Sequence, residues 1–260
     1  MVEGFYLPEG DGRFLATELT RGPWSMDAQH GGPPAALLGH VLEGCAPREE
    51  FRIGRVAVEI LGPVPLAQVR VAARVVRPGR SVEMLEATLE SERGLVMRAV
   101  AWRFRVAEGQ VEVPPAFAPN ERRPGPERES SEFPTAHAVG FHKGLEYRFV
   151  SGSFTEPGPA VCWMRLRYPI VAGTTPSPWE RVLVAADHGN GISSVLGWDS
   201  YVFINTDLTV QLHRMPEGEW VCLDAVTHAQ PEGVGLAESA LFDEKGPIGR
   251  STQTLHLARR

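Results

Sequence analysis

Two stretches of the chain alternate apolar and polar residues at a period of two, which is typical of half-buried β-strands. The first stretch contains four such segments: "RVAVEIL", "QVRVAARVV", "SVEMLEATLES" and "LVMRAVAWRFRV". The second also contains four: "YVFINTDLTVQLH", "EWVCLDAVTHA", "GVGLAESALFD" and "IGRSTQTLHLA". Each set of consecutive short strands predicts an antiparallel meander.

An apolar helix is predicted ahead of each meander. The first lies in "HGGPPAALLGHVLEGC", where glycines and Pro33 or Pro34 open the segment, and proline is favoured in a first helical turn. The second lies in "SPWERVLVAADHGNGISSVLG", with Ser177 as its plausible start. The order of elements is therefore the same in both stretches.

Residues 108–133 separate the two stretches. This segment is rich in proline and charge and has no apolar period, so it is predicted to be a linker that crosses the surface. The chain then divides into an N-terminal half over 1–107, the linker over 108–133 and a C-terminal half over 134–260.

The two halves also share a sequence repeat. Setting "LESERGLVMR" (Leu89 to Arg98) over "LFDEKGPIGR" (Leu241 to Arg250) aligns Leu, Glu, Gly and Arg at a constant offset of 241 − 89 = 152. We interpret the chain as a tandem duplication, each copy a helix wrapped by a curved antiparallel sheet. This is an α+β double hot-dog in which two copies form a pseudo-dimer and pair their sheet edges.

Composition narrows the class of protein. A net charge of -6, without any basic block interleaved with aromatics, argues against a nucleic-acid partner. The three cysteines are far apart and the eight histidines lack metal-ligand spacing, so we expect no disulfide framework and no metal. No basic, apolar leader opens the sequence and no apolar run approaches the roughly 18 residues of a membrane span. We expect a cytoplasmic protein.

The repeat singles out three polar positions in the second copy. Subtracting 152 leads from Asp207, Thr227 and Gln253 to Arg55, Val75 and Ala101, respectively. Aspartate is depleted in strands, and alternation allows all three polar side chains to point to one face. An Asp can deprotonate a water that Thr and Gln hold by hydrogen bonds. The alternative is that all three are solvent-facing strand residues.

Several motifs resemble the acyl-CoA thioesterase-like superfamily, the relatives of type II acyl-CoA thioesterases with a double hot-dog fold. They are "NTDLTVQLHRMPEGEW", "GVGLAESALFDEKG" and "GRSTQTL" in the second half, with "HGGPPAALLGHVLE" and "RVAVEILGPVPL" in the first. The resemblance implies an enzyme of fatty acid metabolism that hydrolyses acyl thioesters, with coenzyme A as part of the substrate and no other cofactor. It also implies that Asp207, Thr227 and Gln253 activate the attacking water.

Two helix segments are candidates for binding the thioester. His30, Gly31 and Gly32 stand where the first helix begins, and helix N–H groups can receive a developing oxyanion. Pro33 and Pro34 remove two of those N–H groups, and a tight turn into the helix is the alternative explanation. In the second helix Asp187 and Asn190 of "ADHGNG" are expected to face the same pocket, unless they only line a helix surface.

Two other functions stay open. A duplicated hot-dog could bind an acyl thioester or lipid without cleaving it, or Asp27 and His30 could serve an enoyl-thioester hydratase or dehydratase. For the thioesterase we expect an apolar tunnel between the two helices for the acyl chain. We also expect that two fused copies can pair further into a homodimer or higher oligomer.

Overall fold

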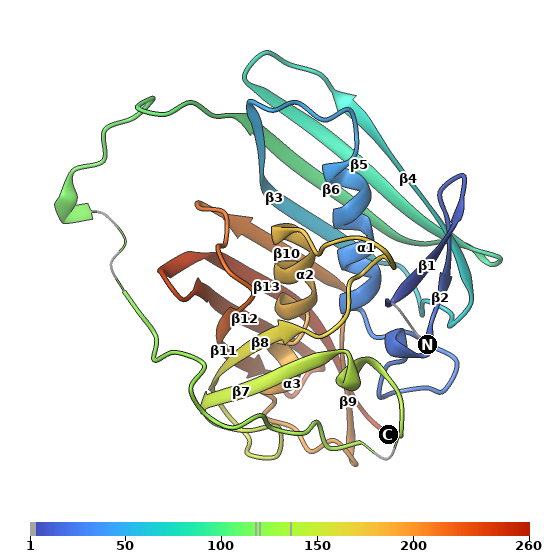
Figure 1. Cartoon of the computed structure of the whole chain (residues 1–260). Helices are drawn as coiled ribbons and strands as arrows, with labels where there is room; N and C mark the ends of the chain where they lie inside the picture. The colour runs from blue at the N-terminus through green and yellow to red at the C-terminus, as the bar shows by residue number, and fades with distance from the viewer. Residues whose placement is uncertain (1–3, 118, 120, 136) are drawn as a thin grey trace.

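The computed structural model describes residues 4–117, 119, 121–135 and 137–260. Its strands form one long antiparallel sheet that curves around two packed helices (Figure 1). The sheet order is β1-β2-β4-β5-β6-β3-β10-β13-β12-β11-β8-β7, and β9 pairs with β13 beside this path. None of the helices in the described ranges is both long enough and apolar enough to cross a membrane.

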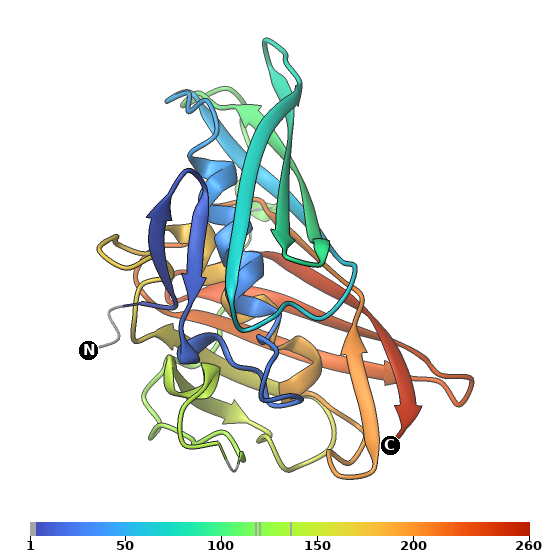
Figure 2. The ribbon, with the colours of Figure 1, turned by 90° about the vertical axis from the view of Figure 1, so that its right-hand side faces the viewer.

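The N-terminal half wraps four strands around one helix. They are α1 (Gly32–Glu43), β3 (Phe51–Ile60), β4 (Gln68–Arg77), β5 (Val82–Ser91) and β6 (Gly94–Arg105). A hairpin of β1 (Tyr6–Gly10) and β2 (Arg13–Ala16) extends the sheet at β4 and lies beside α1, in dark blue in Figure 2. A short 3-10 turn, η1 (Glu18–Thr20), connects the hairpin to the segment before α1.

The C-terminal half repeats this order with a broken helix. Its elements are η3 (Phe141–Lys143), β7 (Leu145–Ser151), β8 (Ala160–Leu166), α2 (Pro178–Ala186), α3 (Gly189–Ile192), β9 (Tyr201–Asn205), β10 (Asp207–Leu212), β11 (Val221–Ala229), β12 (Val234–Asp243) and β13 (Gly246–Arg259). A shift of 152 carries the bounds of β5 onto those of β12, since 82 + 152 = 234 and 91 + 152 = 243. The predicted duplication and double hot-dog fold are confirmed.

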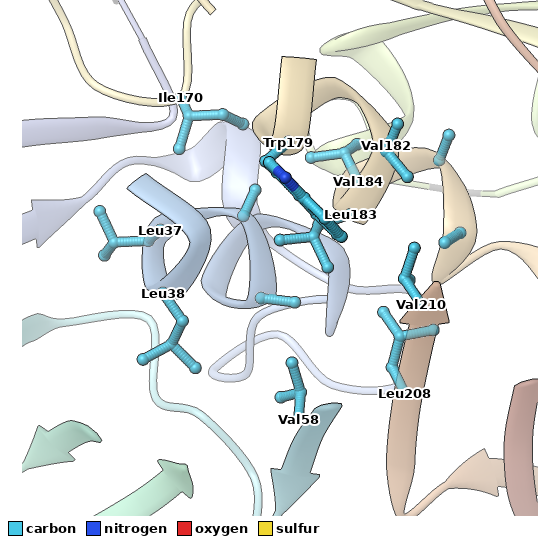
Figure 3. Close-up of a cluster of buried hydrophobic side chains, with 14 of the residues drawn as sticks. Leu37, Leu38, Val58, Ile170, Trp179, Val182, Leu183, Val184, Leu208 and Val210 are labelled. Atoms are coloured by element: carbon cyan, nitrogen blue, oxygen red, sulfur yellow. The ribbon is translucent and has the colours of Figure 1, made fainter. Parts of the chain in front are cut away.

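The two halves meet at their sheets and at their helices. Strands β3 and β10 pair side by side, with Val58 opposite Leu208, so one sheet runs through both copies. Helices α1 and α2 pack antiparallel, and a Cβ added to Gly39 would stand 2.5 Å from Leu183 Cδ1. The close approach therefore depends on glycine. Figure 3 shows the apolar side chains that fill the space between these helices and β3 and β10, including Leu37, Leu38, Val58, Trp179, Leu183, Leu208 and Val210.

Local sequence explains where the helices begin and end. Ser177 and Glu180 form a reciprocal capping box at the start of α2, which satisfies backbone N–H groups that a helix start leaves free. Prolines occupy the first turn of α1, as the sequence predicts. The second helix ends at Ala186 and resumes for one turn at Gly189, so its continuous length is shorter than that of α1.

Among the described residues of the proline-rich segment over 108–133, one 3-10 turn forms, η2 (Pro115–Phe117), and residues 121–133 return to the C-terminal half (Figure 1). Arg123 pairs with Asp224 of β11 at 2.7 Å. Trp163 Nε1 of β8 donates to the backbone oxygen of Pro124 at 2.7 Å. These contacts cover a small apolar cluster of Trp163, Trp220, Cys222 and Phe242 on the face that points away from the helices.

Candidate active site

A row of three residues crosses the inner face of the C-terminal sheet. Thr227 of β11 lies opposite Ala237 of β12, which in turn lies opposite Gln253 of β13. Paired residues project to the same side of a sheet, so Thr227 and Gln253 share a face about 10 Å apart, two strand spacings. Both side chains are buried, Gln253 with only 1% exposure. The structure therefore brings these two predicted residues to one face.

The break between α2 and α3 lies directly over this row. The Asn190 N–H donates to Gln253 Oε1 at 3.0 Å, and Gln253 Nε2 donates to the backbone oxygen of Asp187 at 3.2 Å. Ser193 Oγ lies 2.8 Å from Thr227 Oγ1. An unbroken helix would use these backbone groups in its own ladder. The break frees them to pair with buried polar side chains of the sheet.

Asp187 places a buried carboxylate where the two halves meet. Its Oδ1 accepts from Asn205 Nδ2 at 2.8 Å, and its Oδ2 lies 3.0 Å from His30 Nδ1. A Cβ added to Gly31 would stand 2.8 Å from Oδ2, so the carboxylate touches the segment where α1 begins. A buried carboxylate that approaches a second ionisable group in this way is a strong candidate for proton transfer.

His30 has two hydrogen-bonding options at the same nitrogen. With a proton on Nδ1 it donates to Asp187 Oδ2; without that proton Nδ1 accepts the Gly32 N–H at 3.1 Å. The ring also stacks on Phe141 of η3 at a centroid distance of 3.8 Å. Stacking fixes the orientation of the imidazole, while its protonation determines which partner it holds.

His188 lies beside this pair but in a different electrostatic environment. Burial, followed by the charge of His30, lowers the pKa of His188 to about 3. The ring is therefore neutral near pH 7, and it lies 3.0 Å from both the backbone oxygen of Val184 and the Tyr147 hydroxyl. The neutral ring donates one bond and accepts the other, so His188 is a structural group.

Asp207 lies on the opposite face of the sheet. Asn205 pairs with Leu255 and Thr209 pairs with Thr252, so four steps along β9–β10 match three along β13. The extra residue makes a β-bulge that reverses the alternation, leaving Asn205 inward and Asp207 outward. The Asp207 Oδ1 accepts a hydrogen bond from the Thr254 N–H at 2.8 Å. The expectation that Asp207 shares a face with Thr227 and Gln253 is corrected, because the bulge lies between them.

The pairing of Asp27 with His30 is also corrected. Asp27 is exposed on the loop before α1, and its backbone N–H bonds to Ser25 Oγ. The carboxylate next to His30 comes instead from Asp187, in the other half of the chain. Sequence spacing could not reveal this pair, since the residues are far apart along the chain and meet only because α1 and α2 are antiparallel.

Two buried serines of this face were missed by the sequence analysis. Ser239 of β12 and Ser251 of β13 lie opposite each other and are buried on the inner face. The repeat contains the signal that would have found them. Subtracting 152 gives Ala87 and Ala99, which are apolar in the first copy.

An aromatic cluster lies near the helix break. Trp198 stacks on Trp24 at 5.1 Å between ring centroids and packs on Phe203 at 4.7 Å. The tip of the Trp198 ring reaches 3.9 Å from where a Cβ on Gly191 of α3 would stand. Aromatic residues from both halves thus border α3, next to the helix break.

Two family models divide the chain between them. Residues 20–104 match the acyl-CoA thioesterase N-terminal domain and residues 115–257 match the acyl-CoA thioesterase C-terminal domain. The chain belongs to the acyl-CoA thioesterase family. No curated protein matches it.

Solved structures share the fold of this thioesterase over nearly its whole length. A proposed thioesterase II from Thermobifida fusca YX is 18% identical with a TM-score of 0.75, covering 98% of this chain and 95% of its own. A hot-dog protein of unknown function from Alicyclobacillus acidocaldarius is 15% identical with a TM-score of 0.74, covering 96% and 95%. Acyl-CoA thioesterase II TesB2 from Mycobacterium marinum is 10% identical with a TM-score of 0.62, covering 98% and 95%.

Proposed function

We propose that this protein hydrolyses acyl-CoA thioesters and that Asp187, in place of Asp207, is the carboxylate that activates water. The observation that carries the proposal is the convergence of His30, Asn205 and Gln253 on the buried Asp187 carboxylate. Family membership supplies the reaction class, and this cluster is the buried polar centre where the two halves meet. Three of its four residues, Asp187, His30 and Gln253, are candidates from the sequence, and Asp207 lies outside it.

The reaction requires one proton transfer in each direction. Water attacks the thioester carbonyl carbon, a C–O bond forms, and Asp187 takes the water proton. The carbonyl electron pair moves to oxygen, where N–H groups near the start of α1 stabilise the charge; Gly31 at this start is in contact range of the Asp187 carboxylate, since a Cβ added to it would stand 2.8 Å from Oδ2. The intermediate then collapses, the C–S bond breaks, and the departing thiolate takes the proton. No metal or organic cofactor is required for this chemistry.

The remaining residues position these groups. Gln253 is fixed by the Asn190 N–H and the Asp187 backbone oxygen, so its amide is oriented before substrate binds. Asn205 holds one oxygen of Asp187 and His30 borders the other. The Thr227 hydroxyl pairs with Ser193 Oγ in this structure. It can instead form a hydrogen bond to a water or to the substrate carbonyl.

Thiol release from a panel of acyl-CoAs tests the proposal, with Asp187→Asn compared against Asp207→Asn. Asparagine cannot accept the proton, so we expect kcat of D187N to fall about 10²–10⁴-fold. The D207N control keeps an acceptor for the Thr254 N–H and should retain activity within about threefold. Melting temperatures should change little in both. The reverse pattern, an inactive D207N and an active D187N, would refute the role of Asp187.

Two outcomes would change the function itself. Stabilisation by acyl-CoA without thiol release would favour a binding protein. The His30–Asp187 pair makes hydration of 2-enoyl thioesters the second catalytic candidate, because an acid and a base border one site. That activity would remove the conjugated double bond of a 2-enoyl-CoA while the thioester stays intact, so absorbance and thiol release distinguish it from hydrolysis.

A further inference from the structure

The space between the two helices cannot hold an acyl chain at the positions where they touch. Leu183 fills the place of a side chain at Gly39, and the Val184 backbone oxygen would lie 3.2 Å from a Cβ on Gly32. Helix α1 therefore contacts α2 directly, and the expected tunnel between them is not formed there. An acyl chain attached to a carbonyl near Gln253 requires another apolar compartment.

The inner face of the C-terminal sheet changes character just beyond Gln253. The next inward row joins Ala229 of β11, Gly235 of β12 and Leu255 of β13. Leu257 follows on the same face, about 13 Å along the strand from Gln253. Leu257 packs over Gly235, where an added Cβ would stand 3.2 Å from its Cδ1, and the two leucines of β13 provide an apolar wall beside Ala229.

A cavity of about 420 Å³ lies at this end of the face, within the size range of ligand pockets. Its walls include Leu196, Tyr201, Ala229, Leu257, and, at the strand ends, Gln230 and Arg259. Two other cavities have a different chemistry: one is bordered by Arg48, Arg52 and Arg103, and the other by His137, His142, Lys143 and Arg167. Of these three compartments, only the one at Leu257 continues the row that starts at Gln253.

Trp198 lies in the apolar cluster next to this cavity, outside the residues that line it. It packs in the same apolar cluster as Leu255 and Leu257. Its Nε1 is buried and has no hydrogen-bond partner among the described residues. A buried N–H without an acceptor is costly, and a carbonyl oxygen of a bound ligand would satisfy it.

We propose that the cavity at Ala229 and Leu257 receives the acyl chain of the thioester, and that Trp198 donates a hydrogen bond to a carbonyl of the same substrate. The proposal rests on the proposed function, since it places the chain relative to a carbonyl at Gln253. The depth of this cavity then determines which chain lengths the enzyme prefers. Ala229 sets that depth from one side and Leu257 from the other.

The test is the chain-length profile of Ala229→Leu, measured as kcat/KM for saturated acyl-CoAs from acetyl to hexadecanoyl. A leucine at this position fills part of the cavity, so we expect a loss of at least tenfold for long chains and less than threefold for acetyl-CoA. The matched control is His228→Leu, which adds the same side chain to the neighbouring, outward-facing position. Its profile should match that of the wild type.

Two further variants keep the test decisive if A229L folds poorly. Leu257→Ala enlarges the cavity and should shift the optimum to longer chains. Trp198→Phe removes the donor and should lower kcat/KM by a similar factor at every chain length. An equal loss at all lengths in A229L, the same change in H228L, or an unshifted optimum in L257A would each overturn the proposal.

Failure of the proposed function gives a different result. If wild-type protein releases thiol from no acyl-CoA, hydrolysis is rejected, and the cavity is examined by the rise in melting temperature that dodecanoate causes. Loss of that rise in A229L with retention in H228L would support the acyl compartment. An identical rise in both variants, or none in the wild type, would overturn it.

Discussion

The inner faces of the two sheets differ at corresponding positions. The second copy has buried polar residues at Thr227, Ser239, Ser251 and Gln253, where the first copy has Val75, Ala87, Ala99 and Ala101. The helix that covers each inner face also differs: α1 is continuous, whereas α2 and α3 are separated by Asp187 and His188. Polar strand residues and a broken helix are thus one feature, because the break frees the backbone groups that the strands require.

The β-bulge that turns Asp207 to the outer face is present at the corresponding position of the first copy. In the first copy the pairing of β3 with β6 shifts between Ile53 and Arg55, so Gly54 is the extra residue. The counterpart of Gly54 is Thr206, since 54 + 152 = 206, and the bulge of the second copy falls there. The duplication therefore preserved a bulge as well as the strands. A residue just after it, Arg55 or Asp207, loses the face that simple alternation assigns to it.

Ala101→Gln, which gives the first copy the residue of the second, should have the largest effect on stability. The new amide would face inward beneath a helix that offers no free backbone groups, in a position with no exposed surface. An unsatisfied buried amide and overpacking together should cost about 4 kcal/mol of unfolding free energy. Urea unfolding would show this as a lower midpoint with an unchanged slope.

The control for A101Q is Ala57→Gln, an addition of the same side chain to a less buried position of β3. This change should cost less than about 1 kcal/mol. A tolerated A101Q would mean that a broken helix is unnecessary for a polar inner face.

Gln253→Ala converts the second copy to the residue of the first. We expect turnover to fall about 100-fold, or about 3 kcal/mol in activation free energy, because Asp187 and the Asn190 N–H lose the amide that lies between them. Steady-state thiol release measures the effect. The control is Gln211→Ala, whose side chain is exposed on β10 and which should keep wild-type rates. Full activity in Q253A would separate the polar row from catalysis.

His188, in the helix break, should make the stability of the protein depend on pH in the acid range. Its unfolded pKa is near 6.5 and its folded pKa is about 3, so below pH 6.5 the unfolded chain takes up a proton that the folded protein refuses. Stability is therefore lost as the pH falls from about 6.5 towards 3. The pH then lies about 2.5 units below the unfolded pKa at pH 4, and at about 1.4 kcal/mol for each unit the loss of unfolding free energy should reach about 3 kcal/mol.

Unfolding experiments at pH 7 and pH 4 measure this loss. His188→Gln should shrink the difference between the two pH values, whereas His256→Gln, at an exposed position of β13, should leave it unchanged. An identical acid loss in H188Q would show that other groups cause it.

The fold could be predicted from the sequence because the strand periodicity and the duplication can both be recognised in it. Alternation located the strands of the two meanders, except that it predicted β9 and β10 as one strand, and the offset of 152 related the two sets. Gln253 and Thr227 share a face as expected because no bulge separates their pairings with β12. Asp207 was misplaced because its face depends on one inserted residue, although a glycine inside the first strand was an available sign of a bulge. The His30–Asp187 pair needed the helix packing itself.

The outer faces differ by the smallest amount. Glu86 of β5 is held by Arg74 and Arg98, and its counterpart Glu238 lies 3.8 Å from His228, its one ion-pair partner among the residues that the structure describes. The hydrogen bond from Arg74 is the main reason that the pKa of Glu86 is lowered, so its contribution is present above the unfolded pKa and is lost in acid. Both arginines are largely exposed, and water screens the pairs. Glu86→Gln should therefore cost only about 1 kcal/mol at pH 7 and less in 1 M salt, while Glu238→Gln should be neutral. Equal costs in the two variants, measured by urea unfolding, would show that the outer faces of the copies are energetically alike.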